Sequence, residues 1–292
     1  MRLRRLLFST RAQPLYSFFP GAEPIAEQAV LLSSALREVA PDFEAPTLVT
    51  SSDITTCPSP NICESLATQL STPNSRSSKS HVMQIGGLAG LPFTGREGWS
   101  LYRDAAAKTE QTDLLVVYGC HAAVNASTGL ISEKVRSSIM NAWEVVDAVE
   151  GIDGISDDLL SDRFNVQQAY LYLRLAAQYD TIAAHPEPLI KLVYSNFGMV
   201  QDYLREVIDW SEVSNVRLAA LGGITLTVVE DGTIPVQSAL QSAASKLFMP
   251  VSFELLDTEE GALYDLMDDI VPNDANRPPY RKLLFPLPQT EP

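Results

Sequence analysis

The chain has 292 residues, of which 46% are hydrophobic and 20% are charged, and its formal net charge is −15. This length and composition are typical of a globular protein with one large or two small domains and a substantial core. The acidic balance excludes nucleic-acid binding through a broad basic surface, because such binding needs clustered lysines and arginines. No apolar run reaches the roughly 18 residues of a membrane helix, so we expect neither a nucleic-acid nor a membrane partner. Three cysteines, an odd and low number, do not suggest a disulfide scaffold and favour an intracellular protein.

The two ends of the chain differ in composition from the rest. Residues 1–13 contain four arginines and no acidic residue, a composition typical of organelle transit peptides. We therefore expect residues 1–20 to be either a transit peptide, for a plastid or a mitochondrion, or a disordered tail. The proline-rich end predicts an irregular tail over 259–292. The domain itself is then expected to span residues 21–258.

The first half of the chain alternates between helices and strands. Apolar residues recur at helical spacing over 22–40, and Pro41 follows the end of that helix. The further elements expected are a strand over 46–52, a helix over 61–70, and strands over 81–87 and 113–124. These strands are apolar on successive residues, which is typical of parallel strands with both faces covered. The sequence therefore predicts an α/β fold with a central, largely parallel sheet flanked by helices.

The second half of the chain predicts helices followed by strands. The elements expected are helices over 156–179 and 188–208, two strands within 216–236 and a strand over 249–257. Gly222 and Gly223 interrupt the apolar run of 216–236, and we interpret them as the break between its two strands. In the first half of the chain, the stretch 86–111 carries five glycines without the spacing of a phosphate-binding loop. We interpret it as a connection between the strands over 81–87 and 113–124.

Few residues in this chain can carry metal or nucleophilic chemistry. His121 lies near the end of one predicted strand and Cys57 lies just beyond another, so parallel strands would bring them to one edge. Zinc binds Cys, His and carboxylate ligands, and a catalytic zinc needs three of them and one open position. Cys120 would point away from His121, because neighbouring residues of a strand face opposite sides. This geometry disfavours a cysteine nucleophile with His121 as its base. The structural alternative is a buried histidine and small buried cysteines.

Several segments in a fixed order resemble the low-CO2-inducible LCIB family. They are GGLAGLPFTGREGW at 86–99, LLVVYGCHAAV at 114–124, DLLSDRFNVQQAYLYLRLAAQYD at 158–180 and LAALGGITLTVVEDG at 218–232. The resemblance covers roughly residues 20–256. It implies a β-carbonic-anhydrase-like α/β fold, a zinc cofactor and interconversion of CO2 and bicarbonate.

The resemblance also implies a zinc site with Cys, His and Cys ligands beside an Asp-Arg pair. His121 matches the family histidine. With Cys57 as the first ligand of the motif Cys-x-Asp-x-x-x-Arg, Ser59 replaces the Asp and Cys63 replaces the Arg.

In the other register of this motif, Asp53 matches the Asp, Ser51 replaces the ligand and Cys57 replaces the Arg. The second cysteine ligand is expected near 137–146, where Met140 and Asn141 stand instead. We therefore take Cys57, His121 and Cys63 as candidate zinc ligands and Asp53 as the candidate catalytic carboxylate.

These departures leave two functions open. One is a carbonic anhydrase with a rearranged or eroded zinc site, because a neutral amide or thioether is a poor substitute for a thiolate ligand of zinc. The other is a non-catalytic family member that binds an active paralogue. The resemblance implies a homodimer, or a heterodimer with such a paralogue.

Overall fold

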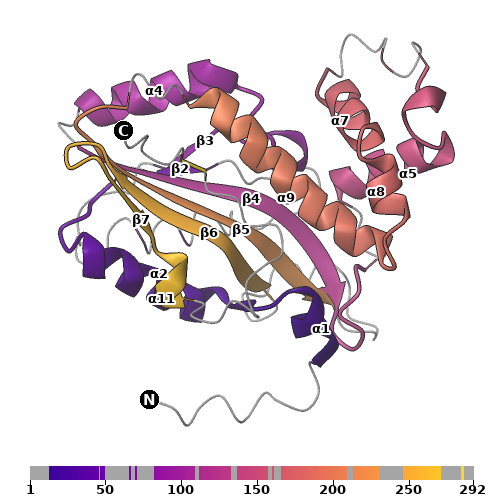
Figure 1. Ribbon diagram of the computed structural model, residues 1–292, viewed down its shortest axis with the longest axis horizontal. Helices are drawn as coiled ribbons and strands as arrows, with labels where there is room; N and C mark the ends of the chain where they lie inside the picture. Colours follow the sequence, from indigo (N-terminus) through magenta and orange to yellow (C-terminus); the bar gives the residue numbers. More distant parts are fainter. Residues whose placement is uncertain are drawn as a thin grey trace, which may run out of the picture.

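The computed structural model describes residues 13–45, 47–49, 66, 70, 82–108, 112–132, 137–156, 160, 166–208, 213–229, 246–270 and 284–285. One central sheet carries helices on both of its faces (Figure 1). The predicted α/β class is therefore confirmed. None of the helices in these residues is long and apolar enough to cross a membrane.

The sheet joins a parallel half to an antiparallel half. Its strands are β1 (Glu23–Pro24), β2 (Thr47–Val49), β3 (Val82–Gln84), β4 (Asp113–Asn125), β5 (Arg217–Val229), β6 (Lys246–Asp257) and β7 (Ala262–Asp265). They are ordered β1-β6-β5-β4-β2-β3, and β7 pairs with β6. Strands β3, β2, β4 and β5 are parallel, whereas β6 is antiparallel to β5, β1 and β7. The sheet is thus mixed rather than largely parallel. Strand β6 begins at the end of the sheet where β5 finishes, so it runs antiparallel to β5.

Helices cover the two faces of the sheet unequally. They are α1 (Gln13–Phe18), α2 (Ile25–Val39), η1 (Leu88–Gly90), α4 (Gly95–Lys108), α5 (Ser138–Ala148), η2 (Ile152–Gly154), α7 (Val166–Ala176), α8 (Tyr179–Ala183), α9 (Pro188–Val207) and α11 (Met267–Ile270). In Figure 1, α4 and α9 lie above the sheet, and α2 and α11 lie below it. Helices α5, α7 and α8 lie together at the end where α9 begins, and we call this region the α5–α8 corner.

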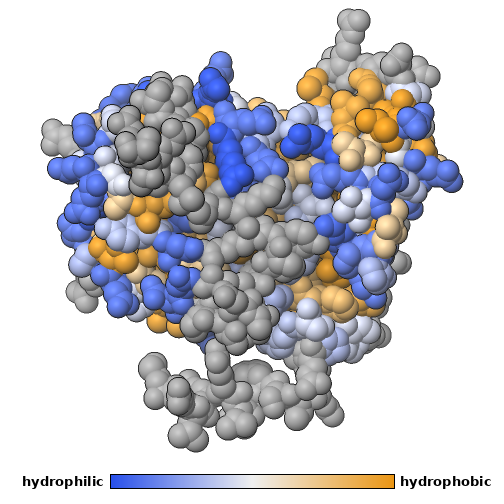
Figure 2. Space-filling view, in the orientation of Figure 1, coloured by the Kyte–Doolittle hydropathy of each residue, from blue (hydrophilic) through white to orange (hydrophobic). Residues whose placement is uncertain are grey.

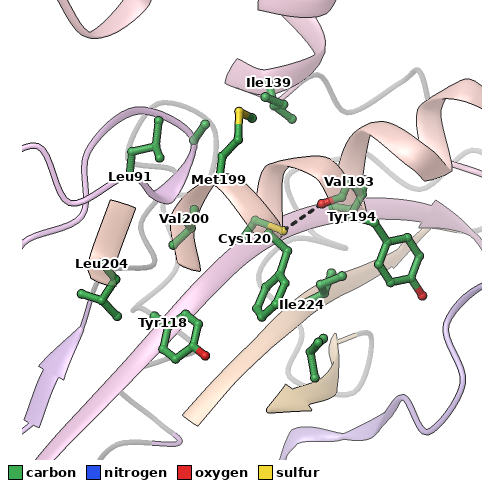
Figure 3. Close-up of a cluster of buried hydrophobic side chains, with 14 of the residues drawn as sticks. Leu91, Tyr118, Cys120, Ile139, Val193, Tyr194, Met199, Val200, Leu204 and Ile224 are labelled. Carbon is green, nitrogen blue, oxygen red and sulfur yellow. Dashed lines mark hydrogen bonds between the residues drawn. The ribbon is translucent and has the colours of Figure 1, made fainter. Parts of the chain in front are cut away.

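Each face of the sheet builds its own hydrophobic core. Along β4, Tyr118 and Cys120 belong to a first core, here called core 1, which contains the buried side of α9. Figure 3 shows this core around Cys120. Leu115 and Val117 point the other way into core 2, which contains the buried side of α2. Because both faces are covered, β4 is apolar on successive residues, as the sequence predicted.

Ordered structure extends past both expected domain boundaries. Leu15 and Phe19 pack in core 1, so the chain is folded from α1 onward rather than from residue 21. The expected transit peptide or tail otherwise lies outside the described residues. At the other end, β7 pairs with β6, and Leu284 and Phe285 are buried in core 1. The segment 259–292 is therefore not an irregular tail throughout.

Gly222 and Gly223 lie inside one continuous strand, β5, and do not separate two strands as the sequence suggested. A Cβ on Gly222 would overlap the ring of Tyr118, and one on Gly223 would overlap the ring of Phe248. The register of β6 against β5 also shifts between these two glycines. They serve close packing and a bulge, which are two known uses of glycine within strands.

Candidate functional site

The His121 side chain contacts Thr227 at the carboxyl end of the parallel strands. Its Nε2 lies 2.8 Å from the Oγ1 of Thr227, a fully buried residue of β5. The ring is only half-buried, so part of it is accessible. Its neighbour Cys120 faces the other way, with Sγ 3.6 Å from the carbonyl oxygen of Val193 in α9 (Figure 3). The strand thus separates the two residues, as alternation requires.

Buried polar side chains continue from His121 across the next two strands. Thr225 is in register with His121, and Lys246 is in register with Thr227. Only 3% of Thr225, none of Thr227 and 4% of Lys246 is exposed. They lie on the core 2 side, because Phe248, the register partner of Thr225, packs in core 2. We call His121, Thr225, Thr227 and Lys246 the polar row.

The first turn of α2 places another buried polar group on this face. Gln28 is 1% exposed, and its Oε1 has no hydrogen-bond partner among the residues that the structure describes. It stands one turn before Leu32, which packs in core 2. Pro24 of β1 is in register with Leu247, and α2 begins at the next residue, so one further step along this register reaches Lys246. Gln28 therefore enters core 2 near the start of β6.

The predicted zinc ligands other than His121 cannot be placed. Asp53, Cys57 and Cys63 lie outside the described residues. Within the described part of the chain, no group of three His, Cys, Asp or Glu side chains could hold a metal ion. Strand β2 runs parallel to β4 with Val49 opposite Val117. Strand β2 therefore points toward the end of the sheet that carries His121.

The region where the resemblance predicts a second cysteine ligand contains helix α5. Met140 packs there in core 1, the core that contains Cys120 rather than the polar row. Asn141 is exposed on the surface of the same helix.

The contact with Thr227 has a direct chemical consequence for His121. The hydrogen bond between Nε2 and the Thr227 hydroxyl occupies one ring nitrogen, so its direction is set together with the tautomer of the ring. Metal-binding histidines commonly hydrogen-bond through their second nitrogen, which fixes the tautomer and the ring orientation. Among the described residues, His121 is the one member of the predicted ligand set, and its imidazole is a group that binds zinc.

Sequence reasoning found His121 but missed the other members of the row. A signal was present in the ITLTV stretch of β5, where Thr225 and Thr227 alternate with apolar residues. Alternation of this kind places both hydroxyls on one face of a strand. Lys246 and Gln28 gave no comparable signal, because their positions depend on strand pairing between distant segments.

A second buried polar cluster lies in core 1 and has a structural role. The Tyr118 hydroxyl lies 2.5 Å from Ser252 Oγ and accepts a hydrogen bond from Gln201 Nε2 at 2.9 Å. Burial raises the pKa of Tyr118 far above its ordinary value. The phenol therefore stays neutral near pH 7 and acts as a hydrogen-bonding group that joins β4, β6 and α9.

Solved structures of similar fold include those of limiting CO2-inducible proteins. PtLCIB4, a homologue of LCIB, is 20% identical with a TM-score of 0.58, over 87% of this chain and 98% of that chain. A point mutant of PtLCIB4 is 19% identical with a TM-score of 0.58, over 88% and 99%. LCIB itself is 14% identical with a TM-score of 0.55, over 88% and 98%. These likenesses establish the fold.

The sequence itself identifies the family. No curated protein matches the chain. Residues 55–257 match the family described as limiting CO2-inducible proteins B/C beta carbonic anhydrases. This stretch is more than half of the chain and contains β4 and β5 with His121 and Thr227. The chain therefore belongs to the limiting CO2-inducible B/C family of β-carbonic anhydrases.

Proposed function

We propose that this protein is a carbonic-anhydrase-like zinc protein for CO2 and bicarbonate whose ligand set is incomplete, so that it binds zinc weakly and hydrates CO2 slowly or not at all. The observation that carries the proposal is the contact between His121 Nε2 and Thr227 Oγ1 at the carboxyl edge of the parallel strands. Family membership supports the choice of substrate.

The proposed roles follow from the chemistry of each side chain. His121 offers an imidazole nitrogen to the metal while Thr227 contacts its ring, and Cys57 offers a thiolate. The third ligand is Asp53 or Cys63. Zinc, when bound, makes water a nucleophile near neutral pH.

The weak point of this site is its ligand chemistry. The sequence contains no cysteine after Cys120, so the thiolate that the family places near 137–146 is missing. Loss of a thiolate ligand weakens zinc binding, because amide and thioether groups are poor ligands for this ion. Cys63, in one register, also replaces the arginine that would fix a neighbouring carboxylate. Both changes favour weak occupancy and slow turnover.

Metal content and CO2 hydration of the purified full chain test the proposal together. We expect less than one zinc per chain, lost on mild chelation, and little or no hydration in a stopped-flow assay. His121→Ala should remove the residual zinc. His185→Ala is the matched control, because His185 is also half-buried but uses Nδ1 within a local turn, 3.0 Å from the amide nitrogen of Glu187.

Two results would overturn this proposal. One tightly held zinc per chain, with rapid hydration lost in both His121→Ala and Cys57→Ser, would show an intact catalytic site. Asp53 and Cys63 would then be mutated to find the third ligand. Zinc content that is equal in wild type, His121→Ala and His185→Ala would remove His121 from the metal site.

A second candidate function, binding of another subunit, rests on the surface at the α5–α8 corner. Ile152, Val166 and Leu173 are 54%, 69% and 41% exposed. Figure 2 shows hydrophobic surface gathered at this corner of the molecule. Exposed apolar patches commonly mark protein–protein contacts. If this surface joins two copies or an active paralogue, Val166→Glu with Leu173→Glu should lower the mass measured by light scattering, and an unchanged mass would exclude it.

A further inference from the structure

We propose that Glu254 and the part of core 1 around it form a peptide-binding site, and that the chain's own segment with Leu284 and Phe285 is a separable ligand of this site. The chemical class of the ligand is an apolar, proline-flanked peptide that presents two successive backbone amides. The inference depends neither on zinc nor on CO2 chemistry. It concerns the face of the sheet opposite to the polar row.

The first argument is the set of hydrogen bonds that Glu254 accepts. The amide nitrogen of Leu284 lies 2.9 Å from Oε1 and 3.0 Å from Oε2, and that of Phe285 lies 3.1 Å from Oε2. None of Glu254 is exposed, and a buried carboxylate is costly unless hydrogen-bond donors compensate it. Hydrogen bonds to a carboxylate are also stronger than those between neutral groups. The site therefore selects a backbone with two adjacent amide donors.

The second argument is the burial of the two side chains of the segment. Leu284 is 1% exposed and Phe285 is 2% exposed, and both belong to core 1. Neither residue is part of a helix or a strand of the structure. The two residues are thus seated by their side chains and by Glu254 rather than as a further strand of the sheet. Peptides that dock on a folded domain use the same combination of main-chain hydrogen bonds and buried side chains.

The third argument is the sequence around these two residues. Proline occurs at positions 278, 279, 286 and 288. Proline has no amide hydrogen, so it cannot donate to a strand ladder, whereas Leu284 and Phe285 keep their donors. Proline also restricts the backbone before binding, so a proline-rich peptide loses little conformational entropy when it docks. This composition is typical of linear peptides that a domain recognises.

The site beneath the segment is polar at its base, which allows it to open. Ser252 lies two residues before Glu254 on the same face of β6, and its Oγ contacts the hydroxyl of Tyr118. Gln201 donates to the same hydroxyl. Burial and, after it, the negative charge of Glu254 raise the pKa of Tyr118. When the segment leaves, water solvates the carboxylate and these hydroxyls, so the open state strands no buried charge.

Hydrogen–deuterium exchange of the full chain tests whether the segment separates from a folded sheet. We expect the amides of Leu284 and Phe285 to exchange through local opening, with protection factors at least tenfold lower than that of Leu221. Leu221 is a fully buried residue of the central strand β5 and reports opening of the whole fold. Equal protection of the three amides would show that the segment opens only on global unfolding and would overturn the proposal.

A chain that lacks residues 284–292, with a synthetic peptide of residues 281–292 as the probe, tests recognition directly. The deletion should lower the melting temperature, and the peptide should raise it in a saturable way. N-methylation of the Leu284 and Phe285 amides removes both donors and keeps both side chains, so it should weaken peptide binding at least tenfold. Glu254→Gln in the deleted chain should weaken binding as well, whereas Glu97→Gln, at an exposed residue of α4, should not.

Two results of the peptide experiment would overturn the proposal. One is the absence of saturable peptide binding to the folded, deleted chain. The other is equal affinity of the unmodified and N-methylated peptides. If the deleted chain does not fold, Phe285→Ala in the full chain decides by hydrogen exchange. It should lower the protection of the Leu284 amide more than that of Leu221, and an equal lowering would overturn the separable site.

Discussion

The two ends of the β4–β5 strand pair use charged residues in opposite ways. At the starting end, Asp113 and Arg217 are register partners, and Arg217 Nε donates to Asp113 Oδ1 at 2.7 Å. At the carboxyl end, His121 and Lys246 gather beside threonine hydroxyls. The first end pairs a cation with a carboxylate inside the chain, whereas the second brings His121 to a threonine hydroxyl and buries Lys246 opposite the same residue.

The starting end is also more densely connected. Asp113 accepts a second hydrogen bond from Arg217 Nη2 at 2.8 Å and one from the Glu44 amide at 2.8 Å. Arg217 reaches Asp42 at 2.7 Å and lies over the ring of Phe43. Asp113 raises the pKa of Arg217, so the guanidinium remains charged at all relevant pH values. These contacts therefore attach the segment between α2 and β2 to the sheet at the starting end of β4 and β5.

Removal of Asp113 should reduce the stability of the protein more than the other changes below. Asp113→Ala leaves Arg217 without its main partner, and breaking a buried ion pair is costly. Because the Arg217 side chain is 25% exposed and keeps Asp42, we expect the free energy of unfolding to fall by about 2–3 kcal/mol. Urea denaturation measures the change. Asp104→Asn, in the exposed pair with Arg103, is the control and should cost almost nothing.

Loss of the contact between His121 and Thr227 should reduce the stability of the metal-free protein by a smaller amount. His121→Ala strands a fully buried hydroxyl, so we expect a loss of about 1–2 kcal/mol. Thr227→Val should cost less, because water can reach the half-buried ring. The double variant should be no less stable than His121→Ala alone, with a coupling of about 1 kcal/mol by urea denaturation. Strictly additive losses would show that the contact does not hold the ring.

Removal of Asp42, the exposed partner of Arg217 at the starting end, should have the smallest effect on stability. The hydrogen bond from Arg217 lowers the pKa of Asp42 below its ordinary value of 3.8. A lowered carboxyl pKa stabilises the fold above that value and loses this contribution as the pH falls further. Asp42 is largely exposed, so Asp42→Asn should cost at most about 0.5 kcal/mol at pH 7, and this cost should shrink as the pH falls through the lowered pKa. A cost that does not change as the pH falls would point to another contact.

The local elements of the fold were largely predictable, because hydrophobic patterning is a short-range property. The apolar run of β4 and the amphipathic pattern of α9 appear near the residues expected. The direction of β6 was not predictable, since it depends on where the chain returns to the sheet. The Gly222-Gly223 pair misled for a related reason: the rings that need its space come from β4 and β6. The helix α4 within the glycine-rich connection was also missed.

The candidate site was predictable only where one residue carried a signal. His121 stood out as a titratable group at the end of an apolar run. Lys246 and Gln28 are ordinary polar residues in the sequence, and only register and burial place them on the same face. The positions of Asp53 and Cys57 relative to His121 stay predictions.

The way in which the last residues join the sheet has a consequence for synthesis. Glu23 of β1 is in register with Phe248 of β6, so an early segment finds its partner only after most of the chain exists. The fully buried carboxylate of Glu254 then accepts hydrogen bonds from the amides of Leu284 and Phe285, at 2.9–3.1 Å. Contacts of such long sequence separation form slowly. We therefore expect the sheet to acquire its final packing only after residues 284–285 have been synthesised and can reach Glu254.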